Sequence, residues 1–425
     1  MSNNSYPCPS GGEIGRAQVA QAWACGLQPE PAMNPILLKP NAEGGSQVIV
    51  KGKLWKNLSA REYYREHDSL RGVVAEAYED LASRFDVVVM EGAGSVAELN
   101  LRGFDLANLD LVTRFHIPWL LVSDIERGGV FASILGTIGL LRAEERSLLR
   151  AFAVNKFRGD RSLFEDGQRI LEERSGHPCL GVCPYAPDLR LDDEDSLSLP
   201  QESQTSSGRV SARCAILRFP RISNTTDFRL LTGARWVTSP IAEPFEFIFL
   251  PGTKNTIADL AWLRSQGLAE WLCLQHQAGA TIIGICGGFQ MLGTVIRDPL
   301  GMESESLEVA GLGFLPVSTT MLSRKTTRVV QVRSPEGFAY PAYEIHLGET
   351  EYRGSSRKPF AIFADGSAEG MRANRVLGTY LHGAFEDPQV LRELGIPYED
   401  RDVSSYSAWA DWFEPFGDRF EQLFL

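Results

Sequence analysis

Long hydrophobic runs, cysteine pairs and a basic excess are all missing from this 425-residue sequence. No apolar stretch reaches about 18 residues, which excludes an ordinary membrane-spanning helix. The first ten residues carry neither a basic nor an apolar run, so we expect no secretory leader and a cytoplasmic protein. The seven cysteines form no Cys-x-x-Cys pair, which argues against a zinc site or a disulfide framework.

The charge balance excludes a further class of partner. The 54 acidic and 42 basic residues give a net charge of −12. A protein that follows nucleic-acid phosphates normally has a basic face, so we expect no nucleic-acid partner. The length predicts two or three globular domains at about 150 residues each.

Apolar runs of strand length alternate with helical patterns along the chain. The runs are continuous in Val, Ile and Leu, which is typical of strands buried on both faces of a parallel sheet. They span residues 86–90, 117–122, 152–154, 180–182, 212–219, 245–250, 281–285 and 376–380. Helical patterns such as 13–25 and 143–152 lie between them. This alternation predicts an α/β fold.

The segment from residue 187 to residue 211 interrupts this pattern with Asp, Glu, Ser and Gln. Its acid run could bind a metal, but a solvated linker is the preferred interpretation. We therefore predict a first domain over 1–187, a linker over 188–211, a second domain over 212–390 and a C-terminal helical extension over 391–425.

The sharpest local pattern is Thr-Ile-Ile-Gly-Ile-Cys-Gly-Gly-Phe-Gln-Met-Leu-Gly at residues 281–293. A strand, a glycine turn and a helix place Cys286 at the corner where hydrolases with a nucleophile elbow carry their nucleophile. Unpaired N–H groups at a helix start stabilise a thiolate, and the Gly287 N–H can face a developing oxyanion. A buried structural cysteine is the alternative.

Two other strand ends offer the groups that a nucleophilic thiol needs. Residues 247–256 end a strand in a Pro-Gly turn, and the Gly252 backbone can supply a second oxyanion donor. Residues 376–385 deliver His382 at a strand end, where ligands of open α/β sheets gather. We predict that Cys286 and His382 form a catalytic pair. An ordinary structural histidine is the alternative.

These three motifs make residues 212–390 similar to class I glutamine amidotransferase domains. The branch they resemble occurs in cobyric acid synthase and cobyrinate a,c-diamide synthase. The resemblance implies that Cys286 and His382 hydrolyse glutamine. The general pattern has a Glu two residues after the histidine, but Ala384 stands there. The third member of the triad is therefore open, and Glu344 in Tyr-Glu-Ile-His-Leu is a candidate.

Polar residues also end strands in the first domain. Glu91 follows the run 86–90, Asp124 follows 117–122, and Asn155 and Lys156 follow 152–154. Carboxylates there can hold Mg²⁺ on ATP phosphates, although Asp and Asn are also common turn residues. Together they resemble the parallel-sheet P-loop synthetase fold of dethiobiotin synthetase. That resemblance implies that Glu91 and Asp124 serve ATP and Mg²⁺, and that Asn155 and Lys156 lie near the base.

Longer phrases narrow the resemblance to the cobyric acid synthase family. They are Gly-Gly-Glu-Ile-Gly-Arg-Ala-Gln (11–18), Met-Asn-Pro-Ile-Leu-Leu-Lys-Pro (33–40), Ser-Asp-Ile-Glu-Arg-Gly-Gly-Val-Phe-Ala (123–132), Val-Asn-Lys-Phe-Arg-Gly-Asp (154–160) and Pro-Arg-Ile-Ser-Asn-Thr-Thr-Asp-Phe (220–228). The family begins with a Gly-x-x-x-x-Gly-Lys-[Ser/Thr] P-loop, which does not occur in this sequence. We expect roughly forty residues with that loop to be missing, through a start placed at an internal Met or a true truncation.

The resemblance implies an ATP-dependent, glutamine-hydrolysing amidoligase that converts adenosylcobyrinic acid a,c-diamide to adenosylcobyric acid. Its substrates would be glutamine and a corrinoid polycarboxylate. Arg16, Lys39, Arg127 and Arg221 are candidate cationic contacts, or else ordinary structural charges. The alternatives are cobyrinate a,c-diamide synthase, a nucleotide-switch protein of the partitioning-ATPase kind, and a glutaminase-only remnant. The Asp-Ile-Glu-Arg-Gly-Gly phrase argues against the first, and Cys286 with His382 argues against the second.

Overall fold

The computed structural model describes residues 4–40, 45–186, 189, 213–304, 306–353, 358–399 and 406–424. The chain divides into two compact units. Unit 1 comprises Met1–Ala60 and Asp192–Arg401, and unit 2 comprises Arg61–Leu191 and Asp402–Leu425. The predicted linker 188–211, apart from residue 189, lies outside the described residues.

The central sheet of unit 1 has six strands in the order β10-β9-β11-β12-β20-β19, and all neighbours are parallel except β19 with β20. The strands are β9 (Cys214–Leu217), β10 (Arg235–Val237), β11 (Phe247–Leu250), β12 (Thr281–Ile285), β19 (Met371–Ala373) and β20 (Val376–Thr379). The helices are η5 (Thr225–Phe228), α8 (Thr256–Ser265), α9 (Leu268–Gln277), α10 (Gly287–Leu292), η6 (Ala384–Glu386) and α11 (Pro388–Glu393). Buried apolar side chains form two core clusters that include residues of the same strands. The predicted α/β class is confirmed.

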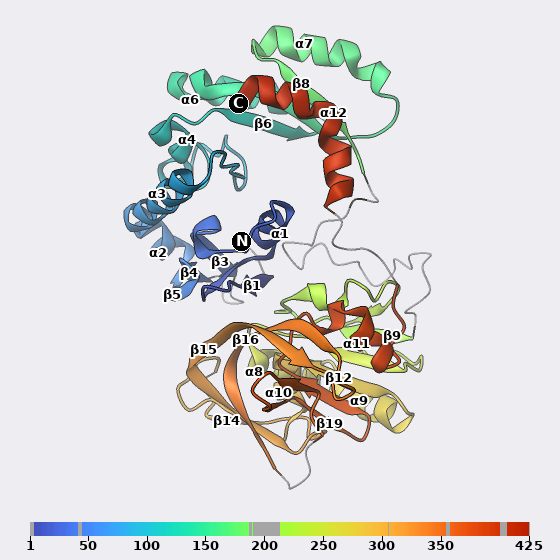
Figure 1. The fold of residues 1–425 in the computed structure, drawn as a ribbon. Helices are drawn as coiled ribbons and strands as arrows, with labels where there is room; N and C mark the ends of the chain where they lie inside the picture. The colour runs from blue at the N-terminus through green and yellow to red at the C-terminus, as the bar shows by residue number, and fades with distance from the viewer. Residues whose placement is uncertain are drawn as a thin grey trace. The chain divides into compact units, whose positions relative to one another are not determined.

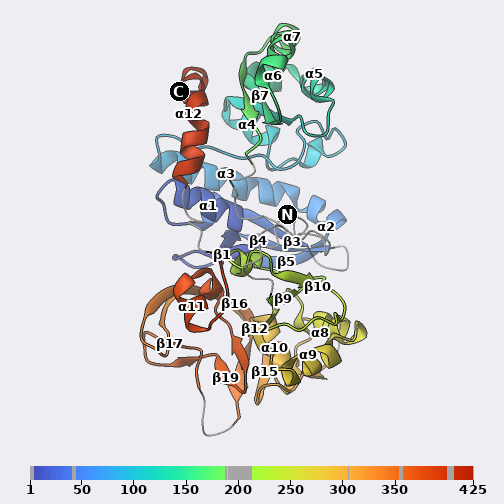
Figure 2. The same ribbon diagram turned by 90° about the vertical axis from the view of Figure 1, so that its right-hand side faces the viewer.

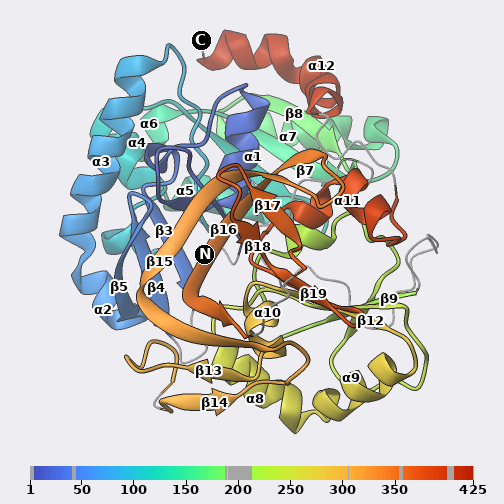
Figure 3. The same cartoon turned by 60° about the horizontal axis from the view of Figure 1, so that its bottom comes forward.

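A long antiparallel hairpin is the part of unit 1 that the sequence patterns did not predict (Figure 3). Its strands are β15 (Val317–Arg333) and β16 (Ala339–Tyr352), and their register shifts between Thr320 and Lys325. The same sheet contains β13 (Val295–Arg297), β14 (Glu308–Ala310), β17 (Ala361–Phe363) and β18 (Ala368–Glu369). The outer half of β15 is mostly exposed or half-buried, so it lacks the continuous apolar run of a central strand.

The first sixty residues contribute small elements to unit 1 (Figure 2). They are β1 (Ser5–Pro7), β2 (Glu13–Gly15), α1 (Arg16–Ala24), η1 (Pro31–Met33), β3 (Ile36–Pro40), β4 (Gly45–Val50) and β5 (Lys53–Ser59). The helix predicted over 13–25 begins only at Arg16, because Glu13–Gly15 pairs antiparallel with Ser5–Pro7. The prediction was wrong for those three residues, since pairing with a neighbouring strand outweighed the helical pattern.

Unit 2 is built on the parallel sheet β6-β7-β8. Its strands are β6 (Trp119–Asp124), β7 (Leu149–Phe157) and β8 (Cys179–Pro184). Its helices are α2 (Ala60–Arg65, which starts at the boundary), α3 (His67–Arg84), η2 (Arg102–Phe104), α4 (Leu109–Phe115), α5 (Val130–Leu140), α6 (Ala143–Leu148), η3 (Arg161–Phe164), α7 (Glu165–Ser175) and α12 (Ser407–Phe424). The helix predicted over 143–152 ends at Leu148, because the next residue opens buried strand β7.

Helix α12 packs on this sheet, beside β8 (Figure 1). Phe416 is buried, and a Cβ placed on Gly181 would lie only 2.4 Å from the Phe416 ring. The end of the helix adds Phe420, Leu423 and Phe424 to a cluster with apolar residues of β7 and β8. The glycine in β8 therefore makes room for an aromatic side chain that is about 230 residues away in the chain.

The strand predicted over 86–90 does not form. This segment has no strand hydrogen bonds, and Val87, Val89 and Met90 are 53%, 81% and 38% exposed. Within the described residues β6 pairs only with β7, so no ladder reaches the segment. An apolar run without a neighbouring strand cannot satisfy its backbone groups in a sheet.

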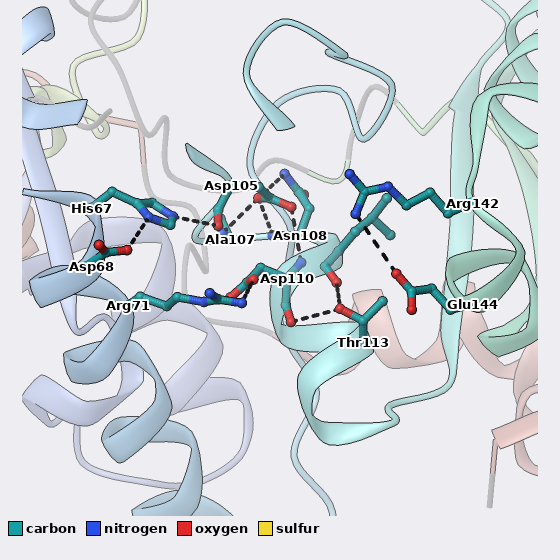
Figure 4. Close-up of polar contacts among 11 residues, drawn as sticks. His67, Asp68, Arg71, Asp105, Ala107, Asn108, Asp110, Thr113, Arg142 and Glu144 are labelled. Carbon is teal, nitrogen blue, oxygen red and sulfur yellow. Dashed lines mark hydrogen bonds and ion pairs between the residues drawn. The ribbon is translucent and has the colours of Figure 1, made fainter. Parts of the chain in front are cut away.

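Polar contacts hold the irregular segment that precedes α4 (Figure 4). Asp105 Oδ1 accepts hydrogen bonds from the N–H groups of Ala107 (3.1 Å) and Asn108 (2.9 Å). Arg71 of α3 binds Asp110 in the first turn of α4.

No helix in the described part of the chain has the length and hydropathy to span a membrane.

Candidate active site

Cys286 lies between β12 and α10 with φ 53° and ψ −111°, a backbone conformation that is strained for a residue with a side chain. Close contacts enforce the corner. A Cβ on Gly288 would lie 1.9 Å from the Leu250 carbonyl oxygen, so only glycine fits there. The elbow predicted from the sequence is therefore present, and its strain turns the thiol out of the strand end.

His382 follows β20, next to β12 in the sheet, and its side chain is completely buried. Its backbone pairs with Tyr343 of β16 through N–H···O=C bonds of 2.9 and 3.0 Å, and the two rings stack with centroids 5.4 Å apart. Its Nδ1 lies 2.7 Å from Oδ2 of Asp227, and the other Asp227 oxygen accepts from Gly383 N–H at 2.6 Å. Asp227 is itself 1% exposed, so this is a buried imidazole–carboxylate pair.

The surroundings of His382 favour its protonated form. Burial alone would lower its pKa, but the charge and hydrogen bond of Asp227, together with Cys286, raise the pKa to about 10. The Nε2 atom has no hydrogen-bond partner among the described residues, which leaves this nitrogen available. A Cβ on Gly252 would lie 2.9 Å from the ring.

Cys286 and His382 thus face each other at neighbouring strand ends. The Cys286 thiol donates to the Ile345 carbonyl at 3.4 Å, so in this state it rests against β16. Catalytic hydrogen bonds are often long before substrate binds, and a rotation about χ1 is enough to redirect a thiol. This arrangement allows proton exchange between sulfur and imidazole during covalent catalysis.

Asp227 is the functional residue that sequence reasoning missed. The phrase 220–228 contains it, but nothing in the local pattern connects an Asp on η5 with a histidine 155 residues later. The alternative candidate, Glu344, does not fill this position. It binds Arg328 and lies 3.6 Å from His346 Nε2, and its pKa is lowered because these two neighbours outweigh the effect of burial.

The predicted oxyanion donors, Gly252 and Gly287, lie at the ends of adjacent strands β11 and β12. A Cβ on Gly287 would lie 2.6 Å from the Thr253 side chain, which shows how closely the two turns approach. Neither N–H makes a backbone hydrogen bond within the described ranges. Both remain predictions.

In unit 2 the structure brings together three of the four residues predicted to serve ATP. Asp124 and Asn155 are register partners on β6 and β7, and Lys156 Nζ binds Asp124 Oδ2 at 2.9 Å. The pKa of Asp124 is lowered, first by this lysine and then by the Glu126 N–H. Glu91 follows the segment 86–90, which forms no strand, so it does not lie at a strand end as predicted.

Three of the four cationic candidates form ion pairs with acidic side chains of the protein itself. Arg16 binds Glu386 at 3.2 Å, Lys39 binds Glu13 at 2.5 Å, and Arg221 binds Asp259 at 3.0 Å. Their charges are compensated locally, so the structural interpretation fits them better than substrate binding. Arg127 is exposed in unit 2.

Comparison with known proteins identifies the family to which this site belongs. Residues 213–390 match the CobB/CobQ-like glutamine amidotransferase domain, and residues 38–192 match an AAA domain. A cobyric acid synthase of Parabacteroides distasonis is 40% identical over 438 aligned positions, which cover 100% of this chain and 88% of the relative. The chain belongs to the cobyric acid synthase family. A Syntrophobacter fumaroxidans cobyric acid synthase (43% identity, 91% of this chain, 80% of the relative) and a Methanoculleus marisnigri probable cobyric acid synthase (47%, 93%, 81%) agree.

Membership of the cobyric acid synthase family explains why the elbow and the buried histidine occur together. Cys286, His382 and Asp227 all lie within the range that matches the amidotransferase domain. The predicted two-part fold, a P-loop-type α/β domain with an amidotransferase domain, is confirmed by the two matches.

Proposed function

We propose that this protein uses ATP and glutamine to amidate side-chain carboxylates of adenosylcobyrinic acid a,c-diamide, giving adenosylcobyric acid. The observation that carries the proposal is the Cys286, His382 and Asp227 arrangement in a chain of the cobyric acid synthase family. Glutamine and the corrinoid are the small-molecule partners. All seven cysteines are free thiols, which fits the reducing cytoplasm.

The glutaminase step uses unit 1. With the Cys286 proton already held by His382, the thiolate Sγ bonds to the carboxamide carbon of glutamine, and Gly252 and Gly287 N–H groups stabilise the oxyanion. Protonated His382 then donates this proton to the departing nitrogen, and ammonia leaves a glutamyl thioester. Water, deprotonated by His382, hydrolyses the thioester to glutamate and restores the thiol. Asp227 holds the ring in the required orientation throughout.

The synthetase step is proposed for the part of the predicted 1–187 domain that belongs to unit 2, from residue 61 onward. A substrate carboxylate attacks the γ-phosphate of ATP, ADP leaves, and ammonia displaces phosphate from the acyl phosphate to form the amide. Asp124 offers a carboxylate oxygen at the end of β6, which suits Mg²⁺ bound mainly by phosphates. Mg²⁺ would neutralise charge on the transferred phosphoryl group. Asn155 and Lys156 remain the proposed base-side contacts, and Glu91 a proposed metal contact.

Separate assays of the two nitrogen sources test this function. Cys286→Ala should release no glutamate from glutamine and should amidate the corrinoid only with added ammonium salt. Cys273→Ala removes an exposed thiol instead and should behave like the parent. Normal glutamate release by Cys286→Ala would refute the nucleophile. Amidation of cobyrinate itself, with none of its a,c-diamide, would assign the chain to the sibling reaction.

A further inference from the structure

Residues near the start of the sequence form hydrogen bonds with the loop that carries Asp227. Asn4 makes two hydrogen bonds with Thr225: its Nδ2 donates to Oγ1 at 3.3 Å, and its Oδ1 accepts from the backbone N–H at 3.2 Å. The Ser5 N–H donates to Asn224 Oδ1 at 3.1 Å. These groups are all buried, and the contacts lie two and three residues before Asp227.

The same segment also packs against residues that contact or follow His382. The Tyr6 ring packs against Tyr343 with centroids 4.7 Å apart, and Tyr343 stacks on His382. Arg16, 2% exposed, binds Glu386 on η6, four residues after His382. One segment, residues 4–16, therefore contacts neighbours of both Asp227 and His382. We call this segment the N-terminal clamp.

The N-terminal clamp lies outside the range that matches the amidotransferase domain, residues 213–390. Within that range the Asp227 loop has little regular structure of its own. Its η5 helix has four residues and follows Asn224, whose φ of 54° is left-handed. A short turn of this kind depends on neighbouring groups to fix it, and here Asn4 pairs with its first backbone N–H.

We propose that the N-terminal clamp, and Asn4 in particular, positions the Asp227–His382 pair, so that glutamine hydrolysis depends on residues outside the amidotransferase domain. The Asn4 side chain bonds to Thr225 and not to Cys286, His382 or Asp227, so it is a positioning residue. Without its side chain the Thr225 N–H has no acceptor, and the loop relaxes away from His382. A displacement of about 1 Å in a catalytic group can lower a rate by roughly 100-fold.

The inference rests on the proposed glutaminase activity and is tested on the full chain by steady-state glutaminase kinetics. Asn4→Ala should lower kcat by about 10- to 100-fold and leave KM for glutamine within about twofold, since the substrate contacts remain. Thr225→Val should lower kcat, and Thr225→Ser, which keeps the hydroxyl, should restore it. Gln275→Ala is the matched control. Gln275 is a buried amide on α9, and its two side-chain hydrogen bonds go to the backbone of Phe245 and Glu243, in the segment that precedes β11.

The outcomes separate this inference from the function on which it rests. Glutamate release by the parent chain and its loss in Cys286→Ala decide whether the site is a glutaminase at all. Given that activity, full kcat in both Asn4→Ala and Thr225→Val overturns the positioning role. An equal loss in Gln275→Ala, or a Thr225→Ser variant as poor as Thr225→Val, overturns it too, because either shows a general packing effect.

Discussion

Asp227 and His382 are 155 residues apart in the chain, yet their side chains meet at 2.7 Å in a fully buried hydrogen bond. The bond fixes which histidine nitrogen faces the thiol. With Nδ1 bound to the carboxylate, Nε2 remains for proton exchange at Cys286.

Asp227→Asn is expected to lower glutaminase kcat by about 10³-fold or more, because an amide can hold the ring in the wrong tautomer. The measurement is glutamate release at saturating glutamine. Glu344→Gln is the matched control, since Glu344 is also a buried acid near the site but binds Arg328. A larger loss in that control than in Asp227→Asn would return the role to Glu344.

The pH profile of glutamine hydrolysis should have an alkaline limb governed by His382. Its pKa is raised to about 10, so the proton needed by the leaving ammonia is present below that pH and lost above it. Removing the Asp227 charge leaves burial as the main influence, which lowers the pKa. The limb should therefore move down by about 1–3 pH units in Asp227→Asn. An unchanged limb would show that another group titrates there.

Gly288→Ala should prevent the amidotransferase fold from forming normally. The new methyl would lie 1.9 Å from the backbone oxygen of Leu250, which cannot move without disturbing the core strand β11. We expect a loss of more than about 3 kcal/mol in the free energy of unfolding. Gly136→Ala in α5, where a Cβ meets nothing within 4 Å, is the control and should be neutral or stabilising. Denaturant titration checks both, and near-parental stability of Gly288→Ala would contradict the close approach.

Two phenylalanines of α12 provide a matched pair. Phe416 is 4% exposed and Phe413 is 37% exposed, so only Phe416→Ala leaves a cavity on the sheet of unit 2. It should lower the free energy of unfolding of that unit by about 3–5 kcal/mol, and Phe413→Ala by less than half as much. Chemical denaturation followed by tryptophan fluorescence makes the comparison. Equal effects would mean that α12 does not dock through Phe416.

The positions of Cys286 and His382 at neighbouring strand ends could be predicted from sequence because each lies in a short, recognisable stretch; their catalytic roles stay predictions. Cys286 lies in its strand–glycine–helix pattern, and His382 directly follows an apolar strand. Asp227 could not be predicted in the same way. Its role depends on which loop the tertiary fold brings to the histidine, and an acid on a short turn has many ordinary uses.

The structural misses also come from tertiary context. The sequence of Glu13–Gly15 is typical of the start of a helix, but in the structure these residues pair with Ser5–Pro7 as a strand. The apolar run 86–90 reads as a strand, but a strand exists only beside another one. Local periodicity predicts what a segment prefers, and neighbours that are distant in sequence decide what it does.

The pairing of Asn4 with Thr225 also has a consequence for synthesis of the protein on the ribosome. The two residues are separated by 221 positions, so Asn4 leaves the exit tunnel long before Thr225 is synthesised. At elongation rates of about 5–20 residues per second, the wait is roughly 10–40 s. Through that interval the Tyr6 ring lacks Tyr343, the aromatic side chain against which it packs in the finished fold. The nascent chain therefore carries an unfinished apolar surface, and this is the interval in which chaperone binding would matter most.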